Sequence, residues 1–202
     1  MNSVLTLEDS DLISAGQTRQ VYQHPEFENL CVKILFSEKS KKVQRRECRY
    51  YRSLQRRNAD FSMVAQMRGV VNTNRGQGVV FDLIKDFDGN VSRTLRHYLL
   101  KNEEPLTQLV IETIEAIKKN FYDNAIVFCD LNTSNILLQR VDEQTYRGML
   151  VDGIAHKDFI PLCNYSVSFS RRKIIRAWNR KVKSWNQKYP TLKDKISLFE
   201  TE

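Results

Sequence analysis

The chain of 202 residues has little glycine and proline and no long hydrophobic segment. With only 7 glycines and 4 prolines, collagen-like and low-complexity structures are excluded. Its apolar runs, such as residues 79–81, are far shorter than the ~20 residues that a membrane-spanning helix needs. The N-terminal residues turn acidic at once, so the basic start of a secretory signal peptide is missing. Hydrophobic residues nevertheless make up 41% of the chain, which is enough for a packed core.

Cysteine is also scarce, and the 4 cysteines form no C-x-x-C pair. Cys31, Cys48, Cys129 and Cys163 are widely spread along the chain. This spacing argues against a zinc site and against a disulfide framework. Reduced thiols are typical of cytoplasmic proteins, and we therefore expect the protein in the cytoplasm.

Positive charge is in excess, with 32 Lys and Arg against 24 Asp and Glu, a net charge of +8. Residues 159–193 contain nine of the bases and no acid, so the remainder is almost neutral. Because the surplus is confined to one segment, we expect no nucleic-acid partner. Apolar residues recur there at helical spacing: Ile174, Trp178, Val182, Trp185 and Tyr189. Two alternatives follow, either packing of this stripe on the rest of the protein or binding of the basic helix to an anionic surface.

Strand patterns come first along the chain and helix patterns come later. Apolar alternation and turn residues predict three short strands in 12–36 and two more at 64–71 and 78–84, joined by a turn at 72–76. Helical periodicity is found at 37–57, 92–101, 106–122 and in the basic segment. This order predicts an α+β protein with a β-rich N-lobe at 1–84, a hinge at 85–91 and a helical C-lobe at 92–202.

Two charged residues fall where apolar ones are expected. Lys33 interrupts an apolar strand, and Glu47 lies on the inward stripe of the next helix with Val43, Tyr51 and Leu54. A buried charge is costly without a partner, so the two are expected to form an ion pair that leaves the ammonium facing a phosphate. The alternatives are that Lys33 reaches solvent from a sheet edge and that Glu47 is solvated.

A polar insert between apolar segments is the strongest signal in the chain. Asp130 and Asn135 stand five residues apart within residues 126–138, and Asp152 directly follows the short apolar segment 149–151. Taken alone, Asp152 before a glycine is a common turn. Together, D-L-x-x-x-N and a later apolar-apolar-D form the pattern of protein-kinase-like enzymes.

A weaker element precedes these motifs. Residues 14–21 align with the glycine-rich phosphate loop, keeping Gly16 and Val21 but replacing the other two glycines with Ser14 and Arg19. The motifs follow one another in the order found in protein kinases: the phosphate loop, the lysine, the glutamate, the aspartate with its asparagine, and the second aspartate. We therefore expect a minimal protein-kinase-like two-lobe fold with a truncated helical C-lobe.

The sequence resembles the PhoP regulatory network protein YrbL family, a small bacterial branch of the protein-kinase-like superfamily. The resemblance rests on residues 13–16 with 21–22, 31–33, Glu47 with Tyr51, 130–136, 150–153 and the basic segment from Arg171. Aminoglycoside and lipopolysaccharide-sugar phosphotransferases share these motifs. The resemblance implies the fold and leaves the substrate open.

The resemblance also implies ATP and Mg²⁺ as cofactors. Lys33, held by Glu47, would bind the α- and β-phosphates, and Gly16 would let backbone N–H groups approach them. Adenine would lie at the hinge near Asp82 and Ile84, with Val21 among the residues that contact the nucleotide.

The remaining roles belong to the polar insert and the second aspartate. Asn135 and Asp152 would hold Mg²⁺, and Asp130 would orient the hydroxyl that accepts the phosphoryl group.

Several positions depart from protein kinases. Cys129 replaces the arginine before the catalytic aspartate, Asn132 replaces the catalytic-loop lysine, and Gly153 replaces the phenylalanine of D-F-G. Only 50 residues follow Asp152, which leaves little room for a protein substrate. A small molecule, sugar or lipid-linked acceptor is therefore expected. The alternative is a non-catalytic pseudokinase that senses nucleotide or binds a partner.

Overall fold

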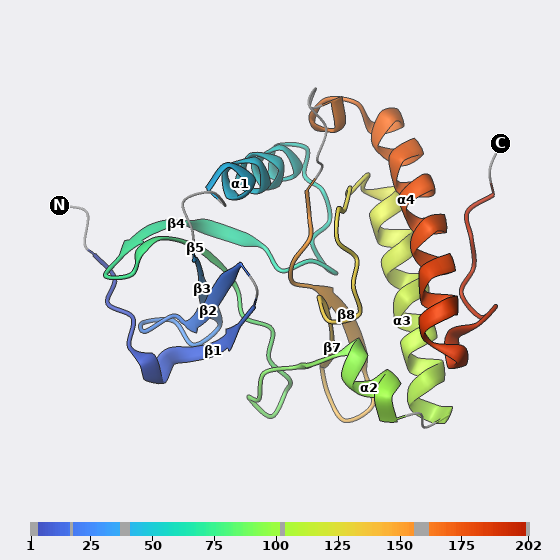
Figure 1. Ribbon diagram of the computed structural model, residues 1–202, viewed down its shortest axis with the longest axis horizontal. Coiled ribbons are helices and arrows are strands. Elements are labelled where there is room, and N and C mark those ends of the chain that lie inside the picture. Colours follow the sequence, from blue (N-terminus) through green and yellow to red (C-terminus); the bar gives the residue numbers. More distant parts are fainter. Residues whose placement is uncertain (1–3, 17, 37–40, 102–103, 156–161, 201–202) are drawn as a thin grey trace.

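The computed structural model describes residues 4–16, 18–36, 41–101, 104–155 and 162–200. An antiparallel five-stranded sheet of order β1-β2-β3-β5-β4 forms the N-lobe (Figure 1). Its strands are β1 (Leu12–Ala15), β2 (Arg19–Gln23), β3 (Leu30–Leu35), β4 (Met67–Thr73) and β5 (Gly76–Asp82), and helix α1 (Lys41–Arg56) lies beside them. A 3-10 turn, η1 (Asp9–Asp11), precedes β1.

The C-lobe is mainly helical and contains a second, three-stranded sheet of order β6-β7-β8. Its elements are β6 (Arg93–Thr94), α2 (Leu95–Lys101), α3 (Glu104–Asp123), β7 (Ile136–Arg140), β8 (Tyr146–Leu150), η3 (Leu162–Asn164), α4 (Val167–Lys188) and η4 (Pro190–Leu192). This architecture confirms the predicted α+β, two-lobe fold.

The β4–β5 hairpin differs from its prediction, because both strands extend to a turn of only two residues. The hydroxyl of Thr73 accepts a hydrogen bond from the Arg75 N–H (3.0 Å) and donates one to the Gly76 carbonyl (2.7 Å). Gly76 has a φ of +101°, a conformation that glycine adopts readily. These local bonds let residues predicted as turn join the ladder.

Helix α1 buries the predicted stripe except at its first member. Glu47, Tyr51 and Leu54 are at most 4% exposed, whereas Val43 is 57% exposed. The neighbouring Gln44 is buried in its place. The inward face therefore begins one position later than predicted, which leaves Val43 at its margin.

One hydrophobic core runs through both lobes, because α1 packs against the C-lobe. The Tyr50 hydroxyl accepts a hydrogen bond from the Val127 N–H at 2.7 Å and lies 3.3 Å from the Ala125 carbonyl. Tyr51 is also completely buried in this core and packs edge-to-face on Phe81 of β5. Helix α1 is thus fixed to the C-lobe as well as to its own sheet.

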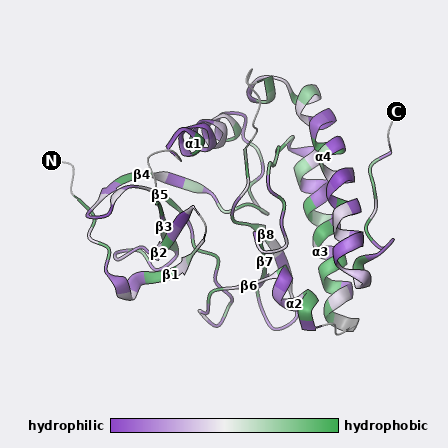
Figure 2. Ribbon diagram, viewed as in Figure 1, coloured by the Kyte–Doolittle hydropathy of each residue, from purple (hydrophilic) through white to green (hydrophobic). Residues whose placement is uncertain are grey.

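The apolar stripe of α4 lies in the same core. Ile174, Trp178, Val182 and Trp185 are at most 2% exposed, and Figure 2 shows hydrophobic positions, in green, interspersed with purple hydrophilic ones along α4. Packing of this stripe within the protein is confirmed, since its tryptophans are covered. Binding of the basic face to an anionic surface stays a prediction. Within the described ranges, no helix is long and apolar enough to span a bilayer. The four cysteines, all of which lie in the described ranges, form no disulfide with one another.

The segment between the lobes folds back as a turn that is anchored to the C-lobe. Asp86 accepts a hydrogen bond from the Ser92 hydroxyl (2.5 Å) and forms an ion pair with Arg140 of β7 (3.1 Å). This turn positions the residues just before it, Leu83 and Ile84, at the mouth of the cleft between the lobes.

Candidate functional site

A cavity of about 750 Å³ lies between the lobes. Its walls come from β1, the loop after it, β2, β3, the segment 82–84 and the ends of β7 and β8. The cavity brings together seven of the predicted site residues: Gly16, Val21, Lys33, Asp82, Ile84, Asn135 and Asp152. Glu47 and Asp130 lie outside the lining.

Lys33 is held at the floor of this cavity by the middle strand of the sheet. It pairs with Val21 of β2 and Val79 of β5, and only 6% of it is exposed. Its ammonium donates a hydrogen bond to the backbone carbonyl of Val151 and lies 4.4 Å from the centre of the Phe81 ring. The partner of the buried charge is therefore a C-lobe carbonyl.

The expected ion pair between Lys33 and Glu47 is not formed, because Arg19 occupies Glu47. Its guanidinium nitrogens lie 3.2 and 3.3 Å from the Glu47 carboxylate. Burial raises the pKa of Glu47, and the charge of Arg19 opposes this shift. Arg19 is the first residue of β2, and its forked guanidinium matches the geometry of a carboxylate, which suits it to pair with Glu47.

Arg19 also reaches the second aspartate, since its Nε lies 3.8 Å from Asp152 Oδ2. Burial alone would lower the pKa of Arg19, but the charges of Glu47 and Asp152 raise it. From the sequence, Arg19 was only a lost glycine of the phosphate loop. Two sequence features indicate its role: Glu47 lies on the buried stripe and needs a cation as partner, and the phosphate loop carries an arginine in place of a glycine.

Tyr51 places a buried hydroxyl near the same charges. Burial and the carboxylates of Glu47 and Asp152 raise the pKa of Tyr51 well above its ordinary value, so the phenol stays protonated. Among the described residues, its hydroxyl has no hydrogen-bond partner.

Asn135 and Asp152 are adjacent because a backbone hydrogen bond joins their loops. The Val151 N–H donates to the Asn135 carbonyl at 2.9 Å, and Asp152 follows directly. Carboxylate and amide oxygens suit Mg²⁺, which commonly keeps several waters and binds substrate phosphates through one or two protein ligands. The described part of the chain holds no group of three His, Cys, Asp or Glu that could enclose a metal. The pair thus fits a Mg²⁺ that is shared with a nucleotide, and it does not fit a cage built by protein alone.

Gly153 brings the loop of Asp152 against the loop of Asp130. Its carbonyl accepts a hydrogen bond from the Cys129 N–H at 2.8 Å. Its φ is +89°, and a Cβ at this position would lie 2.3 Å from the Asp130 carbonyl oxygen. Only glycine permits this close approach of the two loops. The positive φ and the close approach together explain why Gly153 stands where protein kinases have the phenylalanine of D-F-G.

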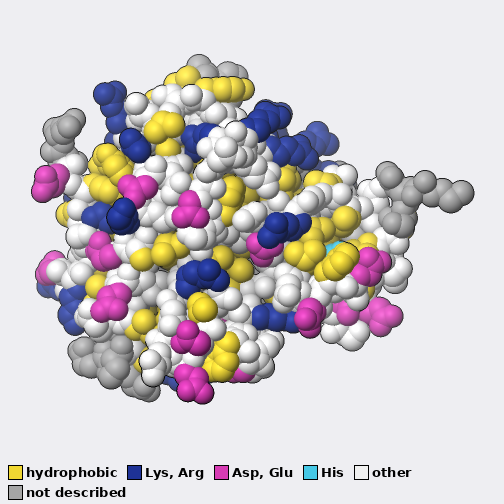
Figure 3. Space-filling view, turned by 180° about the vertical axis from the view of Figure 1, so that it is seen from behind, with side chains coloured by type: hydrophobic (Ala, Val, Ile, Leu, Met, Phe, Trp, Pro, Cys, Tyr) yellow, Lys and Arg dark blue, Asp and Glu magenta, His cyan; other side chains and the backbone are white. Residues whose placement is uncertain are grey.

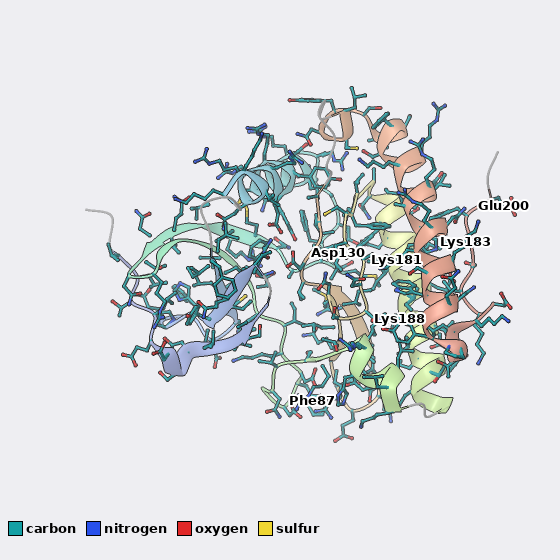
Figure 4. All side chains as sticks on the ribbon, in the orientation of Figure 1. Phe87, Asp130, Lys181, Lys183, Lys188 and Glu200 are labelled. Atoms are coloured by element: carbon teal, nitrogen blue, oxygen red, sulfur yellow. The ribbon has the colours of Figure 1, made fainter. Side chains whose placement is uncertain are left out.

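A chain of polar side chains surrounds Asp130, whose carboxylate is exposed (Figure 4). Asn135 Nδ2 lies 3.2 Å from its Oδ2, and the Asn132 amide donates to its Oδ1. The ammonium of Lys181, on α4, donates to Asn132 Oδ1 at 2.6 Å. Burial lowers the pKa of Lys181, while the charge of Asp130 raises it. Figure 4 shows Lys181 on the side of α4 that faces Asp130, with Lys183 on the other side.

Sequence reasoning missed Lys181 because it is one of nine bases in its segment. The signal was its position, three residues after Trp178 and four before Trp185, at the margin of the buried stripe. A lysine at this position points toward the rest of the C-lobe and is partly buried, whereas its neighbour Lys183 is exposed.

The predicted nucleotide residues Asp82 and Ile84 line the cavity, but the Asp82 carboxylate and the Ile84 carbonyl both have partners within the protein. The Asp82 carboxylate forms an ion pair with Arg68 (2.6 Å) and accepts a hydrogen bond from the Gln66 N–H (3.1 Å). The Ile84 carbonyl accepts one from the Ser92 N–H (3.0 Å). The Asp82 side chain is thus occupied by its own lobe.

Comparison with solved structures places this fold beside the crystal structure of Rad53 residues 1–466 in complex with AMP-PNP. The TM-score is 0.54 at 15% sequence identity, over 75% of this chain and 39% of that one. At this identity the likeness concerns the kinase-like fold alone.

Comparison of sequences gives nearer relatives. The proteins called YrbL from Escherichia coli (strain K12) and Shigella flexneri are each 34% identical over 181 residues, which is 88% of this chain and 86% of theirs. The model of the PhoP regulatory network protein YrbL family matches residues 5–186. With a match over nearly its whole length, the chain belongs to the PhoP regulatory network protein YrbL family.

Proposed function

We propose that the protein transfers the γ-phosphoryl group of ATP, with Mg²⁺, to a hydroxyl of a small molecule, sugar or lipid-linked acceptor. The observation that carries the proposal is the convergence of Lys33, Asn135 and Asp152 on one cavity of nucleotide size. Asp130 lies at its edge, hydrogen-bonded to Asn135. This set of charges matches what phosphoryl transfer needs.

Each group has one task in this proposal. Lys33 leaves the Val151 carbonyl to bind the α- and β-phosphates, and backbone N–H groups near Gly16 approach the phosphates. Asn135 and Asp152 would hold Mg²⁺, which would neutralise charge on the phosphate oxygens when bound. As the acceptor oxygen bonds to the γ-phosphorus, the bond from that phosphorus to the bridging oxygen breaks and ADP leaves. Asp130 accepts the hydroxyl proton.

The experiment that tests the activity uses ATP labelled in the γ-phosphate. The protein is incubated with it alone and then with fractions of a cell extract. Label on a sugar or lipid supports the proposal and identifies the acceptor class, whereas label on the protein itself indicates autophosphorylation. Absence of transfer in every fraction contradicts the proposal.

Lys181 donates a hydrogen bond to Asn132, the residue that replaces the catalytic-loop lysine of protein kinases, and so supplies a cation beside that position. We expect Lys181→Met to lower kcat by roughly a hundredfold, the usual cost of removing one electrostatic group from a transition state. Because burial lowers the pKa of Lys181, its charge is lost at lower pH than that of an ordinary lysine. Wild-type activity should therefore fall on the alkaline side, and this fall should move to higher pH in Lys181→Arg.

The matched control is Lys183→Met, which removes an exposed lysine two residues away on the same helix. It should leave both kcat and the pH profile unchanged. Equal losses in the two variants, or an identical alkaline limb in Lys181→Arg and wild type, would show that Lys181 only contributes to net charge.

The second candidate function is nucleotide sensing without catalysis. It is favoured by the Arg19 guanidinium, which lies beside Asp152 where a metal would bind. A fixed cation there could bind phosphates in place of Mg²⁺.

The two functions differ in the effect of Arg19→Met on ATP binding, measured by thermal shift with and without Mg²⁺. For the phosphotransferase, binding by wild type depends on Mg²⁺, and the variant keeps that dependence. For the sensor, wild type binds ATP without Mg²⁺, and the variant loses most of this affinity, at least about tenfold for a charge-assisted contact. Lys85→Met, outside the cavity lining, serves as the control.

A further inference from the structure

A second cavity, of about 630 Å³, lies on the outer side of α1 and shares no lining residue with the cleft. Helix α1 forms one wall, the β4–β5 hairpin contributes Val70, Gln77 and Val79, and residues 164–165 close one end. The size is that of a small-molecule site.

Four arginines of α1 line this cavity, and they make it strongly basic. Arg45, Arg49, Arg52 and Arg56 follow one another at steps of four, three and four residues, which places them on one side of the helix. Among the described residues none of the four forms an ion pair, and none of those that line the cavity is acidic. Figure 3 shows dark-blue side chains gathered along the upper edge of the molecule, over α1.

Such a row of like charges is unfavourable in the empty protein. Neighbouring arginines on one helix face repel one another, and this repulsion is relieved only by an anion. The buried charges on the other faces of α1 behave differently, because Glu47 has Arg19 as its partner. The unbalanced charge is thus confined to the wall of the cavity.

The remaining walls are uncharged, and they combine polar side chains with the apolar Val70 and Val79. Gln44 is buried beside the arginines, and Gln77 faces them from β5. The Ser53 hydroxyl donates to the Asn164 carbonyl at 2.9 Å, which fixes the end wall to α1. Tyr165, 84% exposed, stands next in this wall. The cavity therefore combines hydrogen-bonding groups with cations.

We propose that this cavity binds a soluble small molecule that carries two or more phosphate groups. Guanidinium forks match phosphate oxygens two at a time, so each arginine can make a bidentate contact. The row from Arg45 to Arg56 spans about 16 Å at a rise of ~1.5 Å per residue. One phosphate cannot contact this whole row, whereas a ligand with several phosphates can.

The site has a consequence for the cleft, which rests on the proposed function. Helix α1 carries the arginine row on one face and Glu47, the partner of Arg19, on another. A ligand bound to the arginine row therefore contacts the same helix that holds the partner of Arg19, the group beside Asp152. If phosphate in the cavity changes the affinity of the cleft for nucleotide, then by linkage nucleotide changes the affinity of the cavity for phosphate by the same factor.

Calorimetric titration with sodium tripolyphosphate at constant ionic strength tests the site itself. The variant is Arg49→Gln with Arg52→Gln, and both side chains are exposed, so folding should be unaffected. We expect its Kd to rise at least about tenfold, because two charge-assisted contacts are lost. Arg172→Gln with Arg176→Gln removes the same charge from two exposed positions of α4 and should change Kd less than twofold.

Lys33→Met separates this cavity from the cleft. It should retain tripolyphosphate binding, because Lys33 is not part of the cavity. The proposal is overturned if the α4 control loses as much affinity as the α1 variant, or if Lys33→Met alone loses it. It is also overturned if the only binding that depends on Arg49 and Arg52 is to phosphatidylglycerol vesicles. None of these outcomes depends on whether the protein transfers phosphate.

Discussion

Asp152→Asn should reduce phosphoryl transfer by at least about a hundredfold, the cost of one charge that acts on the transition state. Asparagine keeps the size of the side chain and one oxygen, but it removes the negative charge that attracts Mg²⁺. The same change removes a charge from the neighbourhood of Arg19, 3.8 Å away. Initial rates with labelled ATP, over a range of Mg²⁺ concentrations, measure the effect.

The control for this prediction is Asp123→Asn, which removes a carboxylate at the end of α3, where it pairs with Lys119 at the surface. This variant should keep the wild-type rate. Asp130→Ala provides a second arm, with a similar loss expected because the acceptor hydroxyl loses its base. Wild-type rates in both Asp152→Asn and Asp130→Ala would rule out the catalytic assignment and leave nucleotide sensing as the function.

Gly153→Ala should destabilise the protein strongly and also inactivate it. An L-residue at its φ of +89° costs about 1–2 kcal/mol. The added Cβ would meet the Asp130 carbonyl oxygen at 2.3 Å, and displacing that backbone costs about 1–3 kcal/mol more. The sum, about 2–5 kcal/mol, corresponds to a fall in Tm of roughly 4–20 °C for a chain of this size. Calorimetry measures the Tm, and the labelled-ATP assay measures the loss of phosphoryl transfer that results when Asp130 is displaced.

Gly89→Ala is the matched control, because Gly89 has a similar φ of +85° but no atom within 4 Å of the added Cβ. It should cost only the conformational part, about 1–2 kcal/mol. The difference between the two variants isolates the close approach of the two loops. If both lower Tm equally, Gly153 serves the backbone conformation alone and does not hold Asp130 in place.

The order of elements and the members of the cleft could be predicted because they depend on local patterns. The apolar strand around Lys33, the strand end before Asp152 and the spacing of Asp130 and Asn135 are all readable within short windows. The fold then brings three of these residues to one cavity, as the motif order implied.

The pairing of charges could not be predicted, because it depends on which side chains meet across the fold. The sequence predicts an ion pair between Glu47 and Lys33, but the partner of Glu47 is Arg19, which lies 28 positions earlier in the chain. Lys181 lies 49 positions from Asn132, and nothing in either local pattern indicates that α4 passes the polar insert. Val43 shows the same limit on a smaller scale, since a shift of one position on α1 exchanges it with Gln44.

The burial of Tyr50 against residues 125–127 affects how the chain folds as it is made. Ribosomes add ~5–20 residues per second, so Tyr50 of α1 is synthesised roughly 4–15 s before Val127. The N–H of Val127 donates the hydrogen bond to the Tyr50 hydroxyl. Trp178 is likewise synthesised before Phe199, whose ring packs on it with centroids 6.2 Å apart. Until these segments are made, the arginine-rich helix α1 lacks the C-lobe part of the core on which it packs. The contacts that join α1 to the C-lobe can therefore form only after residue 127 has been synthesised, although the strands of the first lobe are made early.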